Sequence, residues 1–188
     1  MTGTEILAMA NLHTEGDTIG DIEALKFINE WLLMDMGQDA GITDSENIVA
    51  VADTWHNLPS DFIEATEILK DGKPYWGKFY GQDYQGDYDI RNGQIRFPYP
   101  SIFTVYYVRR PAAIAVLTDI PEVNDVFHYP CSLYVAYRFK YYDDEDSNDA
   151  KRLRTEYDFY KDKAIKEFQK MNRSSTKASS RVKTRPWR

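Results

Sequence analysis

The chain has 188 residues, of which 43% are hydrophobic and 14% aromatic, enough for one domain, or one domain with a small insertion, around a real core. The single Cys131 excludes an internal disulfide and a Cys-rich zinc site, so we predict a buried, apolar role for it. No signal peptide pattern and no apolar run near the ~20 residues that cross a bilayer are found, so we expect a soluble protein made in a reducing compartment.

The charge of the chain is unevenly distributed. The net charge is −7, but residues 173–188 contain six basic residues and no acidic one. The other 172 residues therefore hold 17 basic and 30 acidic residues, a net charge of −13. The sequence predicts an acidic body with a basic tail.

Residues 1–46 are predicted to form two helices. The first covers residues 4–13, with Thr4 as its N-cap, and closes near Gly16; the second covers residues 18–36 and stops at Gly37. The predicted apolar stripe of the second helix consists of Ile22, Leu25, Ile28 or Asn29, and Leu32, widened by Phe27, Trp31 and Met34.

Residues 47–111 follow a shorter period of two, which is typical of strands. The dipeptide Asn92-Gly93 predicts a tight hairpin between residues 88–91 and 94–97. Five or six antiparallel strands would then form a small sandwich or barrel-like sheet. The predicted strands cover residues 48–52, 61–69, 74–80, 84–91, 94–97 and 103–109.

Residues 112–172 are predicted to carry a second pair of helices, joined by the acidic turn 143–149. Pro130 would lie in the first turn of the earlier helix, where it is tolerated. Residues 132–142 are apolar or aromatic nearly all round, so other helices, a sheet or a neighbouring subunit must cover them. Asp146, Ser147 or Asn148 would cap the later helix. Its predicted core stripe is Ala150, Leu153, Tyr157, Tyr160, Ala164, Phe168 and Met171.

These patterns predict an α+β fold. Two N-terminal and two C-terminal helices form a bundle, and the antiparallel β domain is inserted between them. Residues 173–188 have no periodicity and few apolar residues, so we expect an extended arm that is disordered in the free monomer.

No catalytic residue, cofactor or metal is predicted. His13, His56 and His128 lie in three different elements without a partner motif, and no glycine-rich phosphate-binding pattern occurs. Asp144, Asp146 and Asn148 match positions 1, 3 and 5 of an EF-hand loop. The required glycine and glutamate are replaced by Asp149 and Thr155, so a solvated capping turn is favoured over a calcium site.

The basic tail is the one stretch whose composition indicates a role other than packing in a core. It is either a solvated terminal run or an arm that orders on an acidic protein surface or near nucleic acid phosphates. Trp187, next to Pro186, favours a protein groove, because a nonspecific phosphate-binding arm needs no terminal Trp anchor.

Several segments together resemble the head–tail connector proteins of tailed bacteriophages, also called adaptor or head-completion proteins. Pro130 is the main departure from the pattern. The segments that carry the resemblance are FINEWLL (27–33), DTWHNLPSDF (53–62), NGQIRF (92–97), TVYYVRRP (104–111), DIPEV (119–123) and FHY (127–129).

The resemblance implies a non-enzymatic protein of the virion head–tail junction, made in the bacterial host cytoplasm, with no cofactor and no membrane contact. Such proteins form a ring, typically a 12-mer, beneath the portal, extend the DNA channel without binding DNA specifically, and dock tail or stopper proteins. Residues 81–88 are a candidate channel-lining loop. The C-terminal arm would bind the portal through Arg173, Lys177, Arg181, Lys183, Arg185, Trp187 and Arg188.

Three alternatives remain open from the sequence. The chain could be another virion component, such as a tail-completion protein. It could be a nucleic-acid-binding module that uses the basic tail, or a small enzyme, which would need a clustered polar pocket.

Overall fold

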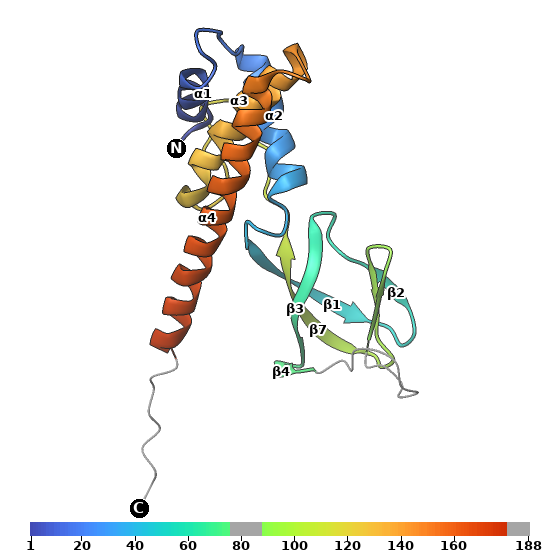
Figure 1. Cartoon of the computed structure of the whole chain (residues 1–188). Coiled ribbons are helices and arrows are strands. Elements are labelled where there is room, and N and C mark those ends of the chain that lie inside the picture. The colour runs from blue at the N-terminus through green and yellow to red at the C-terminus, as the bar shows by residue number, and fades with distance from the viewer. Residues whose placement is uncertain (76–87, 180–188) are drawn as a thin grey trace, which may run out of the picture. The chain divides into compact units, whose positions relative to one another are not determined.

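The structure, a computed structural model, describes residues 1–75 and 88–179, with side chains described up to residue 172 (Figure 1). The chain divides into two compact units. Unit 1 comprises Met1–Asp35 and Ala112–Arg188, and unit 2 comprises Met36–Pro111. Unit 1 is helical and unit 2 consists of small antiparallel sheets, so the predicted α+β class is confirmed.

Helix α1 (Gly3–Leu12) begins with a capping box. The Thr2 hydroxyl accepts a hydrogen bond from the Glu5 backbone N–H at 3.3 Å, and the Glu5 carboxylate accepts one from the Thr2 N–H at 2.8 Å. The predicted N-cap, Thr4, is therefore wrong. Thr4 lies inside the first turn, where its hydroxyl donates to the Leu117 carbonyl at 3.1 Å.

Helix α2 (Asp21–Glu30) starts three residues later than predicted and continues as a π-helix, η1 (Trp31–Asp35). Its buried face consists of Ala24, Phe27, Ile28, Trp31 and Leu32. Two members of the predicted stripe are wrong, because Ile22 is 86% exposed and Met34 is 81% exposed. Ile22 lies about 160° around the helix from Ala24, and the wider π-turn rotates Met34 away from the core.

A 3₁₀ turn, η2 (Asp125–Phe127), leads into α3 (His128–Asp143), and Pro130 lies in the first turn of α3 as predicted. Cys131, Leu133, Val135 and Ala136 are fully buried. The apolar side chains of α3 are covered within unit 1, because α1, α2 and α4 all pack against this helix. A neighbouring subunit is thus not needed to explain the apolar sequence of this helix.

Helix α4 (Asn148–Ser179) is the longest element of unit 1 (Figure 1). Ser147, one of the three predicted caps, accepts a hydrogen bond from the Ala150 N–H at 3.0 Å. The predicted end of the helix at residue 172 is wrong, because α4 continues through Ser179. Residues 173–179, which were predicted to belong to the extended arm, are therefore helical, and the rest of that arm, 180–188, lies outside the described residues.

The described residues of unit 2 form two antiparallel sheets. The hairpin between β5 and β6 was predicted correctly. Asn92 and Gly93 have φ values of 51° and 72°, as a two-residue turn of this kind requires. The first sheet has the order β1 (Thr43–Ala50), β7 (Ser101–Arg109), β3 (Phe62–Lys70), β4 (Lys73–Pro74). The second has the order β2 (Trp55–Asn57), β6 (Gln94–Arg96), β5 (Asp89–Arg91).

The boundaries of other strands differ from the prediction. The first strand ends at Ala50 instead of residue 52 and begins at Thr43 instead of residue 48. Most of the predicted strands 74–80 and 84–91, and residues 81–87 of the candidate channel-lining loop, lie outside the described residues.

The core of unit 2 draws side chains from both sheets. The rings of Phe97 and Phe103 stack with their centroids 3.7 Å apart and their planes 6° from parallel. This pair joins the loop after β6 to the inner face of β7 and anchors the core. The other buried members are Ile48, Ala50, Leu58, Ile68, Ile95 and Val105.

Candidate functional site

The site predicted from the sequence lies at the C-terminal end of α4. The last partly buried side chain of this helix in the described residues is Phe168, whose ring contacts that of Phe127 with centroids 5.5 Å apart. Residues 169–172 are all exposed, and the helix continues to Ser179. This end of α4 leads into the basic tail, residues 173–188.

Two of the predicted contact residues lie on a described helix. Arg173 and Lys177 lie on the distal segment of α4, where only the backbone is described. The remaining predicted contacts, Arg181, Lys183, Arg185, Trp187 and Arg188, lie outside the described residues. Their role stays a prediction.

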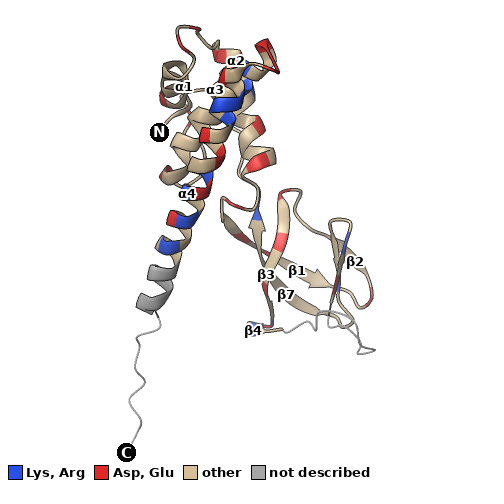
Figure 2. Cartoon of the chain, viewed as in Figure 1, with Lys and Arg blue, Asp and Glu red and all other residues tan. Residues whose placement is uncertain are grey.

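Basic residues outnumber acidic ones on the distal half of the described part of α4, where Asp162 and Glu167 lie among the lysines. Figure 2 shows acidic residues in the turn between α3 and α4, and several basic segments on the distal half of α4. The turn contributes Asp143, Asp144, Glu145, Asp146 and Asp149. Lys163, Lys166 and Lys170 are exposed on the distal half. The described part of the helix therefore already becomes basic before residue 173.

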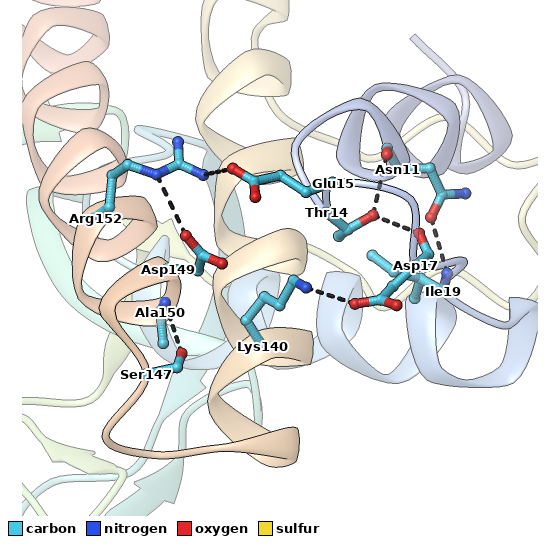
Figure 3. A network of polar contacts seen from close by, with 10 residues as sticks. All are labelled: Asn11, Thr14, Glu15, Asp17, Ile19, Lys140, Ser147, Asp149, Ala150 and Arg152. Atoms are coloured by element: carbon cyan, nitrogen blue, oxygen red, sulfur yellow. Dashed lines mark hydrogen bonds and ion pairs between the residues drawn. The ribbon is translucent and has the colours of Figure 1, made fainter.

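The acidic turn is held by protein contacts. Arg152 pairs with Asp149 at 3.9 Å, and the Ser147 hydroxyl caps α4 (Figure 3). Arg152 also pairs with Glu156 at 3.3 Å. Among the described residues, no group of three or more His, Cys, Asp or Glu side chains could hold a metal ion. These contacts give the turn a structural role at the start of α4.

A polar network that the sequence analysis missed fixes the loop between α1 and α2 (Figure 3). Asp17 pairs with Lys140 of α3 at 2.5 Å, and Glu15 pairs with Arg152 of α4 at 3.3 Å. The hydrogen bond to Asp17 raises the pKa of Lys140 and keeps it charged. Because these partners are far apart in sequence, only a co-variation signal could have linked them.

The same network includes contacts within the loop. The Asn11 side chain accepts a hydrogen bond from the Ile19 N–H at 2.9 Å. The buried Thr14 hydroxyl lies 3.0 Å from the Asn11 carbonyl and 2.5 Å from the Asp17 carbonyl, and it donates to one of them. These bonds satisfy backbone groups between the helices and explain why α2 starts only at Asp21.

The three histidines occupy separate structural positions. His13 ends α1 with its ring edge toward Tyr129, and His56 accepts a hydrogen bond from the Val51 N–H at 3.2 Å. His128 is 1% exposed, and its Nδ1 lies 2.8 Å from the Met1 amino nitrogen. Burial, together with the charge of that amino group, lowers the pKa of His128, and Asp125 partly opposes the shift. None of these contacts places a nucleophile beside a histidine.

Two open hollows carry charged residues. One, of about 180 Å³, lies in unit 2 and is lined by Asp53, Tyr88, Asp89, Arg96 and Pro98. Asp89 is already paired with Arg91 at 2.8 Å and with Arg96 at 3.7 Å. The other, of about 250 Å³, lies between α2 and α3 and is lined by Glu23, Lys26, Phe27, Phe139, Tyr142 and Asp143. Neither combines a nucleophile with a positioned base.

Cys131 is a free thiol at the centre of the bundle. It is fully buried, as predicted, and burial raises its pKa well above the usual value. The thiol therefore stays neutral and packs as a small apolar group.

Among the described helices, none is both long and apolar enough to cross a bilayer.

Comparison with known protein families gives a match. The family model described as SU10 adaptor protein matches residues 1–185, nearly the whole chain. No curated protein matches the chain.

Proposed function

The chain belongs to the SU10 adaptor protein family, and from this premise we propose that it acts at a bacteriophage head–tail junction as a ring-forming connector. Its C-terminal arm, residues 173–188, attaches to the portal protein. The ring, of about twelve subunits by analogy with head–tail connectors, continues the DNA channel and offers a docking surface to tail or stopper proteins. The role is structural, without catalysis or a cofactor.

The observation that supports the arm is the exposure of α4 beyond Phe168 in the described residues. Helix α4 passes Phe168, its last partly buried side chain in the described residues, and continues to Ser179 with exposed residues at 169–172. The following sequence carries four more basic residues and Trp187. A basic segment that is ordered by a partner can wrap a large acidic surface, and a terminal Trp can anchor it in a groove.

The experiment compares portal binding by the full chain and two truncations. One ends at Ser179 and keeps α4 whole, and the other ends at Asn172 and removes the complete arm. Both should fold with thermal midpoints close to that of the full chain, because both keep Phe168, the last partly buried side chain in the described residues. The chain ending at Asn172 should lose co-sedimentation with portal rings, and the one ending at Ser179 should bind at least tenfold more weakly.

A Trp187→Ala variant tests the anchor without removing charge, and Lys151→Met, at the opposite end of α4, serves as a control that should bind normally. Normal docking by the chain that ends at Asn172 would refute the arm proposal. A stable two-fold dimer of the full chain in solution would count against the ring, because a ring needs head-to-tail contacts.

A further inference from the structure

Helix α4 carries a stripe of exposed side chains on the face roughly opposite to its packed one. The packed face bears Leu153, which is fully buried, and Tyr157, whose hydroxyl accepts a hydrogen bond from the Trp31 indole N–H at 3.2 Å. Lys161, at the edge of that face, pairs with the Asp35 carboxylate at 3.1 Å. At about 100° per residue, the members of the exposed stripe lie within about 40° of its centre around the helix axis. These members are Arg152, Thr155, Phe159, Lys163, Lys166 and Lys170.

Phe159 lies at the centre of the stripe, and its side chain is 64% exposed. Its ring contacts that of Tyr160 with centroids 5.2 Å apart, but most of its surface faces water. A single exposed apolar residue needs no explanation by itself. Aromatic residues are, however, enriched at protein interfaces, where one ring can anchor a whole contact. The charges around Phe159 therefore decide which partner fits.

Three lysines follow Phe159 along the stripe. In the described part of the chain, no carboxylate forms an ion pair with Lys163, Lys166 or Lys170. Asp162 and Glu167 belong to the flanks of the helix, about 60° and 80° from the centre of the stripe. A complementary surface would offer an apolar hollow next to acidic groups, because opposite potentials face each other across specific interfaces.

The helical unit itself displays such a hollow between α2 and α3. It has a volume of about 250 Å³, and its lining includes the rings of Phe27, Phe139 and Tyr142 and the carboxylates of Glu23 and Asp143. The ring centroids of Phe27 and Tyr142 lie 5.6 Å apart. A cavity of about 150 Å³ holds benzene, so this hollow has room for one phenyl ring. An incoming ring could pack edge-to-face on the two aromatic walls.

Negative charge dominates at the rim of the hollow. Lys26, its basic lining residue, has its ammonium nitrogen 4.7 Å from the centre of the Tyr142 ring. Asp143 opens the acidic turn that leads to α4, and Asp144 and Glu145 follow it (Figure 2). Within the described residues, none of these three carboxylates forms an ion pair with a basic side chain. The hollow thus offers the apolar and acidic groups that the stripe lacks.

Charge also decides which surfaces of two copies can meet. A contact between the stripes of two copies would bring lysines together, and like charges across an interface are unfavourable. A contact between the stripe of one copy and the hollow of the next pairs opposite charges and joins two different surfaces. Head-to-tail contacts of this kind can close into a ring. Nucleic acid phosphates could also pair with the lysines, but they would leave the ring of Phe159 without a partner.

We propose that Phe159 and the lysines after it dock into the hollow between α2 and α3 of a neighbouring copy of this chain. The phenyl ring packs against Phe27 and Tyr142, and the lysines face Asp143 and the acidic turn. This inference rests on the proposed ring and names the contact that closes it. It makes no use of residues 173–188, because the stripe ends before them.

The test cross-links two variants that each carry one added cysteine. Thr155→Cys lies in the stripe, and Ile22→Cys lies one turn before Lys26, beside the hollow; both positions are exposed. The native Cys131 is buried and inaccessible to the reagent. A concentrated mixture treated with a flexible bifunctional maleimide should give a cross-linked pair, whereas each variant alone should give little. Adding Phe159→Ala to the first variant should lower the yield at least about tenfold, with an unchanged thermal midpoint because the side chain is exposed.

Two controls test the position of the contact. Leu12→Ala removes another exposed apolar side chain of the helical unit and should leave the yield unchanged. Asp158→Cys is also exposed on α4, but it lies about 100° around the helix from Phe159. Used in place of Thr155→Cys, it should cross-link far less.

The proposal is overturned if the mixture gives no more cross-link than the single variants, or if Phe159→Ala leaves the yield unchanged. It also falls if Lys163→Met/Lys166→Met abolishes binding to duplex DNA without lowering the yield, since the stripe would then serve nucleic acid. The chain that ends at Asn172 keeps the whole stripe and should cross-link like the full chain, so the arm and this contact can fail separately. A ring seen on the portal without cross-linking would refute the contact and leave the ring intact. A two-fold dimer that links Thr155→Cys to itself would overturn both.

Discussion

At the scale of single residues, His128 gives the chain a predictable response to pH. Its ring is 1% exposed, and burial lowers its pKa below the value near 6.5 of an unfolded chain. Below about pH 6.5 the unfolded chain therefore binds more protons at this residue than the folded chain, and stability falls. In urea unfolding at pH 7.5 and 5.5, the native protein should lose more stability on acidification than His128→Phe.

A matched control separates titration from the loss of packing. Cys131→Ala also removes a buried group, but the raised pKa of the thiol keeps it neutral at both pH values. This variant should lose about 1 kcal/mol at each pH and follow the native pH profile. An equal acid sensitivity of His128→Phe and the native chain would show that His128 does not titrate as described.

Sequence patterns correctly predicted the role of a single residue where that role depends only on its neighbours in the sequence. The cap Ser147 and the buried Cys131 belong to this class. Thr4 and Ile22 were misplaced because the choice between neighbouring caps, and between two faces of a short helix, depends on what packs against them. The contacts of Asp17 and Lys161 join distant parts of unit 1, and no local pattern contains that information.

At the scale of elements, α3 is the centre of the helical unit. Leu133 is fully buried on it, whereas Leu12 at the end of α1 is 81% exposed. Leu133→Ala should therefore lower the free energy of unfolding by about 2–5 kcal/mol, through lost transfer energy and the remaining cavity. Chemical denaturation at neutral pH measures this difference.

Leu12→Ala makes the same chemical change where little surface is buried, and it should alter stability by less than about 0.5 kcal/mol. Similar losses in the two variants would mean that α3 is not the packed centre of unit 1. The sequence predicted that α3 must be covered on several sides. It could not choose between a neighbouring subunit and the helices of the same chain, because both bury the same apolar residues.

Among the strands, the sequence predicted the position of a hairpin best where the turn residues restrict the backbone conformation. The Asn92-Gly93 hairpin was placed correctly, since both residues must adopt positive φ. Strand β1 was predicted too late because its first half, Thr43–Asn47, is polar and exposed. That half is ordered by pairing with β7, a partner more than fifty residues away, which no period-two pattern reveals.

At the scale of the whole molecule, the alternation of helical and strand periods predicted the α+β class. The separation into an acidic body and a basic tail also follows from composition alone. The length of α4 could not be predicted from composition, because residues 173–179 lack an apolar stripe. These residues extend a helix whose earlier turns are already nucleated and packed. Propagation of an existing helix costs little, so composition underestimates how far it continues.

The distribution of charge predicts how the full chain behaves toward DNA. The body carries −13, and the arm at residues 173–188 carries six basic residues and no acidic one. If the arm supplies the phosphate contacts, the logarithm of the binding constant should fall with the logarithm of the salt concentration by a slope no steeper than about −5. Titration of duplex DNA should show weak, arm-dependent binding at low salt and none near 0.15 M, roughly the physiological ionic strength. Trp187→Ala should leave this weak binding unchanged while it impairs portal attachment, because phosphates do not need the ring. Tight binding that persists at high salt, or that survives truncation at Asn172, would instead favour a nucleic-acid-binding module over a connector through which DNA slides.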